Sequence, residues 1–146
     1  MSDITHLAVQ LFTALLGSAG FAMMFGLRRR YLLPASLGGM LGWAVYLAVE
    51  AWTDITFLAY LTAAAFGVLY AELLARRLKT PATLFVIPAI VPLVPGSTLY
   101  AAMSFAVRGE LDAAREYGTR TLEYALAIAA GISIVVALRE LQAKKV

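Results

Sequence analysis

The sequence predicts an all-α membrane protein: a polytopic bundle of five transmembrane helices, the fourth broken by prolines, plus a short interfacial helix. Of its 146 residues, 62% are hydrophobic and 14% are charged, and the mean hydropathy is +0.81. A soluble domain of this size cannot bury so much apolar surface. Apolar segments of about 20 residues alternate with short charged clusters, as in helical membrane proteins. We therefore expect a single integral membrane domain over residues 1–146, and not a barrel of short alternating strands.

The composition excludes several kinds of chemistry. The chain has no cysteine, which excludes disulfides, thiol catalysis and metal sites built on cysteine. His6 is the one histidine, so a histidine metal cluster is excluded too, and we expect neither a metal nor a cofactor. The net charge of +3 does not indicate nucleic-acid binding, because the basic residues lie at the ends of predicted spans.

The first three spans are predicted at 4–27, 31–49 and 55–75. A signal peptide is the alternative for the first. No Lys or Arg precedes that segment and three arginines follow it, which is the reverse of signal-peptide polarity. Small residues recur at a spacing of four in each span, which favours close helix packing. They are Ser18, Ala22 and Gly26; Gly38 and Gly42; and Ala63, Gly67 and Ala71.

The fourth span, at 81–107, holds four of the chain's five prolines. Pro88, Pro92 and Pro95 share one helix face, and each lacks the N–H that a helix needs. Gly96 follows them and permits a backbone turn. We expect the helix to break here, although a kinked but continuous helix is the alternative. The carbonyls expected to lose their helical donors are those of Leu84, Pro88 and Val91.

This break is the candidate site. Broken backbone at membrane depth is tolerated only where protein buries it or a wet cavity surrounds it. Ser97 or Thr98 is expected to cap a second half-helix whose N-terminus lies near the middle of the membrane. Its free N–H groups suit a carboxylate, and the freed carbonyls of the first half suit an ammonium group or a cation. The candidate substrate-binding residues are Thr83, Pro88, Pro92, Pro95, Gly96, Ser97, Thr98 and Tyr100.

An intramembrane hydrolase with Ser97 as its nucleophile is the enzyme alternative. Such an enzyme needs a base within reach of the hydroxyl. His6 is predicted near the outer surface, and no Lys or Asp lies in the middle of a span. We therefore expect no enzyme activity and no catalytic residue.

A polar stretch at 108–120 precedes the fifth span, which is predicted at 121–138. Leu111, Ala114 and Tyr117 fall on one helical face, with acids and arginines on the other. This pattern predicts a short helix lying on the membrane surface, and a solvated loop is the alternative.

Two acidic residues can reach the interior of the bundle. Glu72 lies one turn before Arg76, and the simplest interpretation is an ion pair between them at the membrane edge. Glu123 lies in the first turn of the fifth span, where Arg120 or the helix N-terminus would satisfy its charge. A role for either carboxylate in proton coupling is the alternative.

The basic residues predict the orientation of the chain. Three clusters hold nine of the twelve Lys and Arg residues, and five spans would place all three on one side. The prediction is an N-terminus outside and a C-terminus in the cytoplasm. The clusters are Arg28, Arg29 and Arg30; Arg76, Arg77 and Lys79; and Arg139, Lys144 and Lys145.

The segments 20–26, 41–46, 71–83 and 87–100 resemble the threonine/serine exporter family, in its short form that carries only the C-terminal five-helix half. The likeness covers roughly residues 18–105. Its distinctive part is Arg-Arg-x-x-x-Pro-Ala-Thr at 76–83 followed by Pro-Leu-Val-Pro-Gly at 92–96. The chain departs from the family pattern at Ala89 and Ser97, where glycines are expected.

The resemblance implies a secondary transporter subunit that exports small amino acids, threonine or serine, or small carboxylates across the inner membrane of a bacterium. It further implies proton coupling and a separate partner with a soluble N-terminal region and five helices. An odd number of spans fits such a partner, because two halves of this kind can form an inverted-topology pair. A non-transporting assembly subunit and a homo-oligomeric channel are the alternatives.

Overall fold

The computed structural model describes residues 2–143 and the side chains of residues 4–141, and every regular element in that part of the chain is a helix. The predicted all-α class is therefore confirmed. The elements are α1 (Ser2–Met24), α2 (Arg29–Thr53), α3 (Thr56–Leu78), α4 (Thr83–Ile90), the 3₁₀ turn η1 (Val91–Leu93), α5 (Gly96–Val107) and α6 (Leu111–Ala143).

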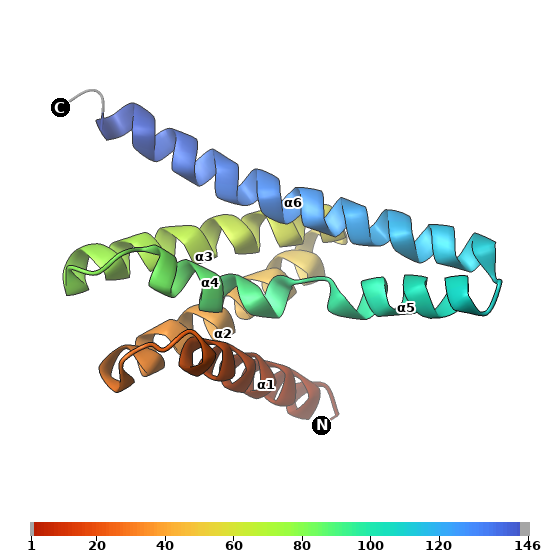
Figure 1. Ribbon diagram of the computed structural model, residues 1–146, viewed down its shortest axis with the longest axis horizontal. Helices are drawn as coiled ribbons and strands as arrows, with labels where there is room; N and C mark the ends of the chain where they lie inside the picture. Colours follow the sequence, from red (N-terminus) through yellow and green to blue (C-terminus); the bar gives the residue numbers. More distant parts are fainter. Residues whose placement is uncertain (1, 144–146) are drawn as a thin grey trace.

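The helices run back and forth along the long axis of the molecule (Figure 1). α1 packs on α2, α2 on α3, and α3 on α6, while α4 packs against α2 and α3. α5 packs chiefly on α6. The hairpin that α5 makes with the start of α6 extends past the ends of α1, α2 and α3 (Figure 1).

The predicted basic clusters lie together at one end of the bundle. Arg28 and Arg30 line a cavity that Lys79 also lines. A second cavity brings Lys79 together with Arg76 and Arg139. The cluster members Lys144 and Lys145 lie outside the described residues. We call this the basic end; it is on the left in Figure 1, where α3 and α6 finish.

Four helices are long and apolar enough to cross a membrane: Ile4–Met24, Arg29–Thr53, Thr56–Leu78 and Leu111–Leu141. The pair Thr83–Leu93 and Gly96–Val107 passes the same test only together, and its two parts are bent by 52°. The chain therefore has four candidate spans, or five if this bent pair crosses as one. Such a pair is either one broken span or a re-entrant loop.

The prediction of a separate interfacial helix is wrong. The polar stretch and the fifth span form one continuous helix, α6, of 33 residues, which is about 50 Å at 1.5 Å per residue. The stretch holds no proline, so its backbone hydrogen bonds continue into the apolar part. The chain turns at Gly109 (φ +80°) before this helix, and Glu123 lies inside it rather than in a first turn.

Glycine and alanine allow α4 to pack closely at the centre of the bundle. A Cβ at Gly67 would lie 3.6 Å from the Ala89 Cβ, and one at Gly38 would lie 3.4 Å from it. A Cβ at Gly42 would lie 3.4 Å from the Ala89 carbonyl oxygen. Because Gly67 is halfway along α3, Ala89 marks the middle of the bundle, as close-packed small residues in membrane helices predict.

Aromatic rings stack across three helices in the half of the bundle away from the basic end. The ring of Tyr46 on α2 lies 4.7 Å from both Trp43 and Tyr60, and Tyr60 on α3 lies 4.6 Å from Tyr124 on α6. Leu93 is fully buried against this cluster. The rings therefore hold the end of η1 against the bundle.

Candidate functional site

The chain is interrupted at residues 91–95, where two of the predicted prolines stand. Pro88 lies inside α4 without ending it, whereas Pro92 lies in η1 and Pro95 immediately precedes α5. The N–H of Val91 donates to the Ile87 carbonyl. Since Pro92 has no N–H, the Pro88 carbonyl loses its helical donor, as predicted.

The prediction that the Val91 carbonyl also loses its donor is wrong. The N–H of Val94 donates to it at 3.2 Å. The cause is the tightening of the backbone into a 3₁₀ turn, which moves the donor from position i+4 to position i+3.

The predicted side-chain cap of the second half-helix is wrong. The residue before α5 is Pro95, whose ring has no oxygen, and no side chain caps the helix. The Thr98 hydroxyl instead donates to the Pro95 carbonyl at 3.0 Å. In the described part of the chain, the N–H groups of Ser97 and Thr98 have no acceptor. The first hydrogen bond of the helix runs from the Leu99 N–H to the Pro95 carbonyl. The start of α5 therefore carries free donors and the positive end of a helix dipole.

This helix start lies beyond the middle of the bundle, not at it. Ala89 sits at the central glycines, and Leu93 already packs beside Ala59 and Tyr60 in the first turns of α3. Gly96 follows still closer to the end that faces away from the basic clusters. The expected helix start near the middle of the membrane stays a prediction.

The predicted site residues divide into two groups. Pro88 is buried, and Pro92, Pro95 and Thr98 are half-buried against the bundle. The exposed group comprises Thr83, Gly96, Ser97 and Tyr100. Tyr100 is 75% exposed and α5 has no buried residue, so this chain does not enclose the start of α5.

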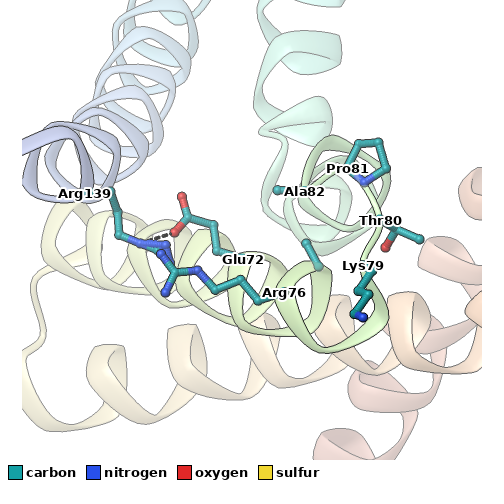
Figure 2. A pocket seen from close by; sticks show the side chains of 8 residues that line it. Glu72, Arg76, Lys79, Thr80, Pro81, Ala82 and Arg139 are labelled. Atoms are coloured by element: carbon teal, nitrogen blue, oxygen red, sulfur yellow. Dashed lines mark ion pairs between the residues drawn. The ribbon is translucent and has the colours of Figure 1, made fainter. Parts of the chain in front are cut away.

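Glu72 forms an ion pair with Arg139, not with Arg76. Its Oε2 lies 2.5 Å from Arg139 Nε, and the two side chains are 18% and 22% exposed. Figure 2 shows them pointing toward each other from α3 and α6. The contact has the distance of an ion pair without hydrogen-bond geometry, so Oε2 lacks a hydrogen-bond partner among the described residues. The last turns of α6 lie along α3, which local spacing could not reveal.

A cavity of about 540 Å³ surrounds this pair at the basic end. Arg76, Lys79 and Arg139 supply three positive charges to its lining, against the one carboxylate of Glu72. Lys79 points away from the ion pair (Figure 2). The excess of positive charge favours an anion in the cavity.

Glu123 is exposed on α6 and does not pair with Arg120. The guanidinium of Arg120 lies 2.7 Å from Glu116, one turn earlier on the same helix. Both groups are more than half exposed, so the pair contributes little to stability. Glu123 faces no interior of this chain.

A smaller cavity, about 240 Å³, lies on the other side of the bundle's middle. Its lining consists of Gln10, Thr13, Ala14, Trp43 and Pro92. Sequence reasoning missed Gln10, Thr13 and Trp43. The available signal was two polar side chains within an otherwise apolar first span, because polar groups inside membrane helices are costly and commonly functional.

Residues 10–138 match the family model described as "Threonine/Serine exporter, ThrE". The match covers most of the chain, including the interruption and all of the candidate site residues. No curated protein and no solved structure matches the chain.

Proposed function

This chain belongs to the threonine/serine exporter family, and from this we propose that it is one membrane subunit of a proton-coupled secondary transporter. Its proposed cargo is a small amino acid, threonine or serine, or a small carboxylate. A second five-helix subunit with a soluble N-terminal region supplies the other half. The pair works in the inner membrane of a bacterium.

The interruption between α4 and α5 carries the proposal. Secondary transporters bind substrates with discontinuous helices, whose free N–H groups receive anionic substrate groups. Here the N–H groups of Ser97 and Thr98 have no acceptor in the described chain. The substrate carboxylate binds there.

The exposure of α5 supports a second subunit. The start of α5 is uncovered, and its apolar side chains Leu99, Met103 and Val107 are 50%, 62% and 89% exposed. The α5–α6 hairpin extends beyond the other helices (Figure 1). A site built on this helix start is complete only when another chain covers it.

The basic clusters lie at one end of the bundle, which supports an orientation with this end in the cytoplasm. The N-terminus then lies outside and the C-terminus inside. The cavity around Arg76, Lys79 and Arg139 faces the cytoplasm, where it concentrates anionic groups of the cargo before export. Glu72, which lines this cavity, is the better placed of the two candidate coupling acids.

The experiment measures threonine efflux from cells that express this chain together with its five-helix partner. Replacing Pro92 and Pro95 by Ala restores two N–H donors, and replacing Gly96 by Ala removes the flexible position after them; the triple variant is expected to reduce efflux at least tenfold. Pro34→Ala is the matched control, because it likewise restores an N–H inside a helix, α2, but away from the interruption.

Co-purification of the partner separates the alternatives. If efflux by the triple variant is unchanged while the two chains still co-purify, the interruption is not the substrate site. If the pair never exports and this chain only stabilises its partner, it is an assembly subunit. Flux from this chain alone, without a proton gradient, would identify a homo-oligomeric channel.

A further inference from the structure

The cavity lined by Gln10, Thr13, Ala14, Trp43 and Pro92, which we call the α1 cavity, lies between α1, α2 and η1. The amide of Gln10 is held in place there: Trp43 Nε1 donates to its Oε1 at 3.3 Å, and its Nε2 lies 3.5 Å from His6 Nδ1. The Thr13 hydroxyl donates to the carbonyls of its own helix and keeps its acceptor sites free.

The α1 cavity ends at a layer one helical turn deeper on all three elements. On α1, Ser18 lies four residues after Ala14. On α2, Gly39 lies four residues before Trp43, and on α4, Pro88 lies four residues before Pro92. A Cβ at Gly39 would collide with the Ser18 hydroxyl and lie 2.9 Å from the Pro88 carbonyl oxygen. We call Ser18, Gly39 and Pro88 the central constriction.

The central constriction contains polar groups that the packing leaves unpaired. The Ser18 side chain is fully buried, and its hydroxyl has no hydrogen-bond partner among the described residues. The Pro88 carbonyl beside it has no helical donor, because the residue four positions later is Pro92, which has no N–H. An unpaired hydroxyl in a membrane interior costs free energy, and such groups mark substrate or ion pathways.

A second, smaller cavity adjoins the constriction on its other face. It measures about 80 Å³ and is lined by Thr83, Ile87 and Pro88 of α4, among others. The α1–α2–α4 seam thus holds a cavity on each side of one closed layer. This is the arrangement expected of a path that is occluded at its middle.

We propose that the α1 cavity binds the uncharged, hydroxyl-bearing side chain of the exported amino acid, and that the central constriction separates it from the cytoplasmic half of the path. This inference rests on the proposed function. The lining includes the polar groups of Gln10, Thr13 and Trp43 but no charge, so it suits a hydroxyl better than a second carboxylate. Its volume lies below the ~300–1,000 Å³ of pockets for drug-sized ligands, which fits a small solute.

Cysteine labelling tests the proposal cleanly, because the chain has no cysteine of its own. Thr13→Cys reports on the α1 cavity and Thr83→Cys on the cavity beyond the constriction. Leu16→Cys is the control, since Leu16 is 54% exposed on the outer face of α1 and lines neither cavity. Each full-length variant is co-expressed with the partner and exposed to a charged thiol reagent in right-side-out or inverted vesicles.

The expected result is labelling of Thr13→Cys only from the side of the N-terminus, labelling of Thr83→Cys only from the basic end, and none of Leu16→Cys. L-Threonine at ten times its dissociation constant is expected to slow labelling of Thr13→Cys about tenfold, as occupancy requires. Valine, which has the same shape without the hydroxyl, is expected to protect far less. Gln10→Leu is expected to abolish this difference.

Equal protection by succinate and threonine, or no protection by either, would overturn the proposal. Failure of the reagent to label Thr13→Cys from either side, because lipid covers the position, would also overturn it. These outcomes are distinct from failure of the proposed function. In that case wild-type vesicles would export neither threonine, serine nor a small carboxylate. Normal efflux together with an unprotected Thr13→Cys would refute only the α1 cavity.

Discussion

Gly39 is the residue on which the three-helix crossing depends most directly. Its missing side chain leaves room for the Ser18 hydroxyl and for the carbonyl of Pro88. In a close-packed interior, an added methyl group forces side chains or backbone to shift, at a cost of about 1–3 kcal/mol. Carbonyl oxygens move less readily than side-chain ends, so this contact is not relieved by a rotamer change.

Gly39→Ala is therefore expected to lower the free energy of unfolding by about 1–3 kcal/mol, measured by thermal denaturation in detergent. Gly17→Ala is the control, because a Cβ at Gly17 meets nothing within 4 Å. Adding Ser18→Ala is expected to recover part of the loss by removing the hydroxyl. If Gly39→Ala and Gly17→Ala were equally stable, the close packing of α1, α2 and α4 at Gly39 would be contradicted.

The ion pair between Glu72 and Arg139 is the other residue-scale feature with a direct test. Both side chains are mostly buried, so removing one partner is expected to cost more than the ~1 kcal/mol of an exposed pair and less than the ~3–5 kcal/mol of a fully buried one. Glu72→Gln tests this by denaturation. The swapped double variant Glu72→Arg with Arg139→Glu is expected to regain stability.

The same variants distinguish a structural role of Glu72 from a role in proton coupling. If Glu72 only links α3 to α6, the swapped variant regains efflux along with stability. If Glu72 carries the coupling proton, the swapped variant folds but does not export. A Glu72→Gln chain as stable as the wild type would refute the ion pair itself.

At the scale of elements, the interruption between α4 and α5 is the feature that proline and glycine chemistry predicted from the sequence. Its position was harder to predict. The depth of Gly96 depends on how far α4 and η1 reach into the bundle, which is set by contacts of Ala89 and Leu93 with other helices. The absence of a side-chain cap likewise follows from the 3₁₀ geometry rather than from the residues Ser97 and Thr98 themselves.

Hydrogen exchange tests the interruption without any transport assay. The amides of Ser97 and Thr98 have no acceptor in the described chain, so they are expected to exchange rapidly in detergent. In Pro92→Ala with Pro95→Ala, a continuous helix is expected to protect both amides by more than tenfold. Protection already present in the wild type would contradict the interruption.

The polar stretch at the start of α6 shows the limit of sequence patterns at this scale. Its amphipathic face was compatible with a separate surface helix, but nothing in the sequence ends a helix before the fifth span. Local backbone hydrogen bonding therefore continues through Arg120 and Glu123. The pairing of α6 with α5 on one side and α3 on the other is a tertiary feature, which no local pattern encodes.

At the scale of the whole molecule, hydropathy and charge were sufficient to predict a helical membrane bundle with its basic clusters at one end. The cavities and the Glu72–Arg139 pair were not predictable, because they join residues far apart in the sequence. The sequence motif at 92–96 nevertheless led to the correct family. Its backbone chemistry is local, and proline acts there through its own missing N–H.

Topology reporters test the proposed orientation and the number of spans. A reporter enzyme that is active only outside the cytoplasm is expected to be inactive when fused after residue 146 and active when inserted at Gly109. Reversing the charges of Arg28, Arg29 and Arg30 is expected to disturb this pattern. If α4 and α5 form a re-entrant loop instead of a crossing, both readings would be reversed: the reporter at Gly109 would be inactive and the one after residue 146 active.

We propose that this chain is half of a proton-coupled exporter whose substrate site is the interruption before α5. The most direct measurement is efflux of labelled L-threonine from proteoliposomes that hold this chain, its partner, or both, with an imposed proton gradient. Gradient-dependent efflux is expected only with both chains. It is expected to be lost in the Pro92, Pro95 and Gly96 triple-alanine variant and retained in Pro34→Ala. Undiminished efflux from the assembled triple variant, or gradient-independent efflux from this chain alone, would contradict it.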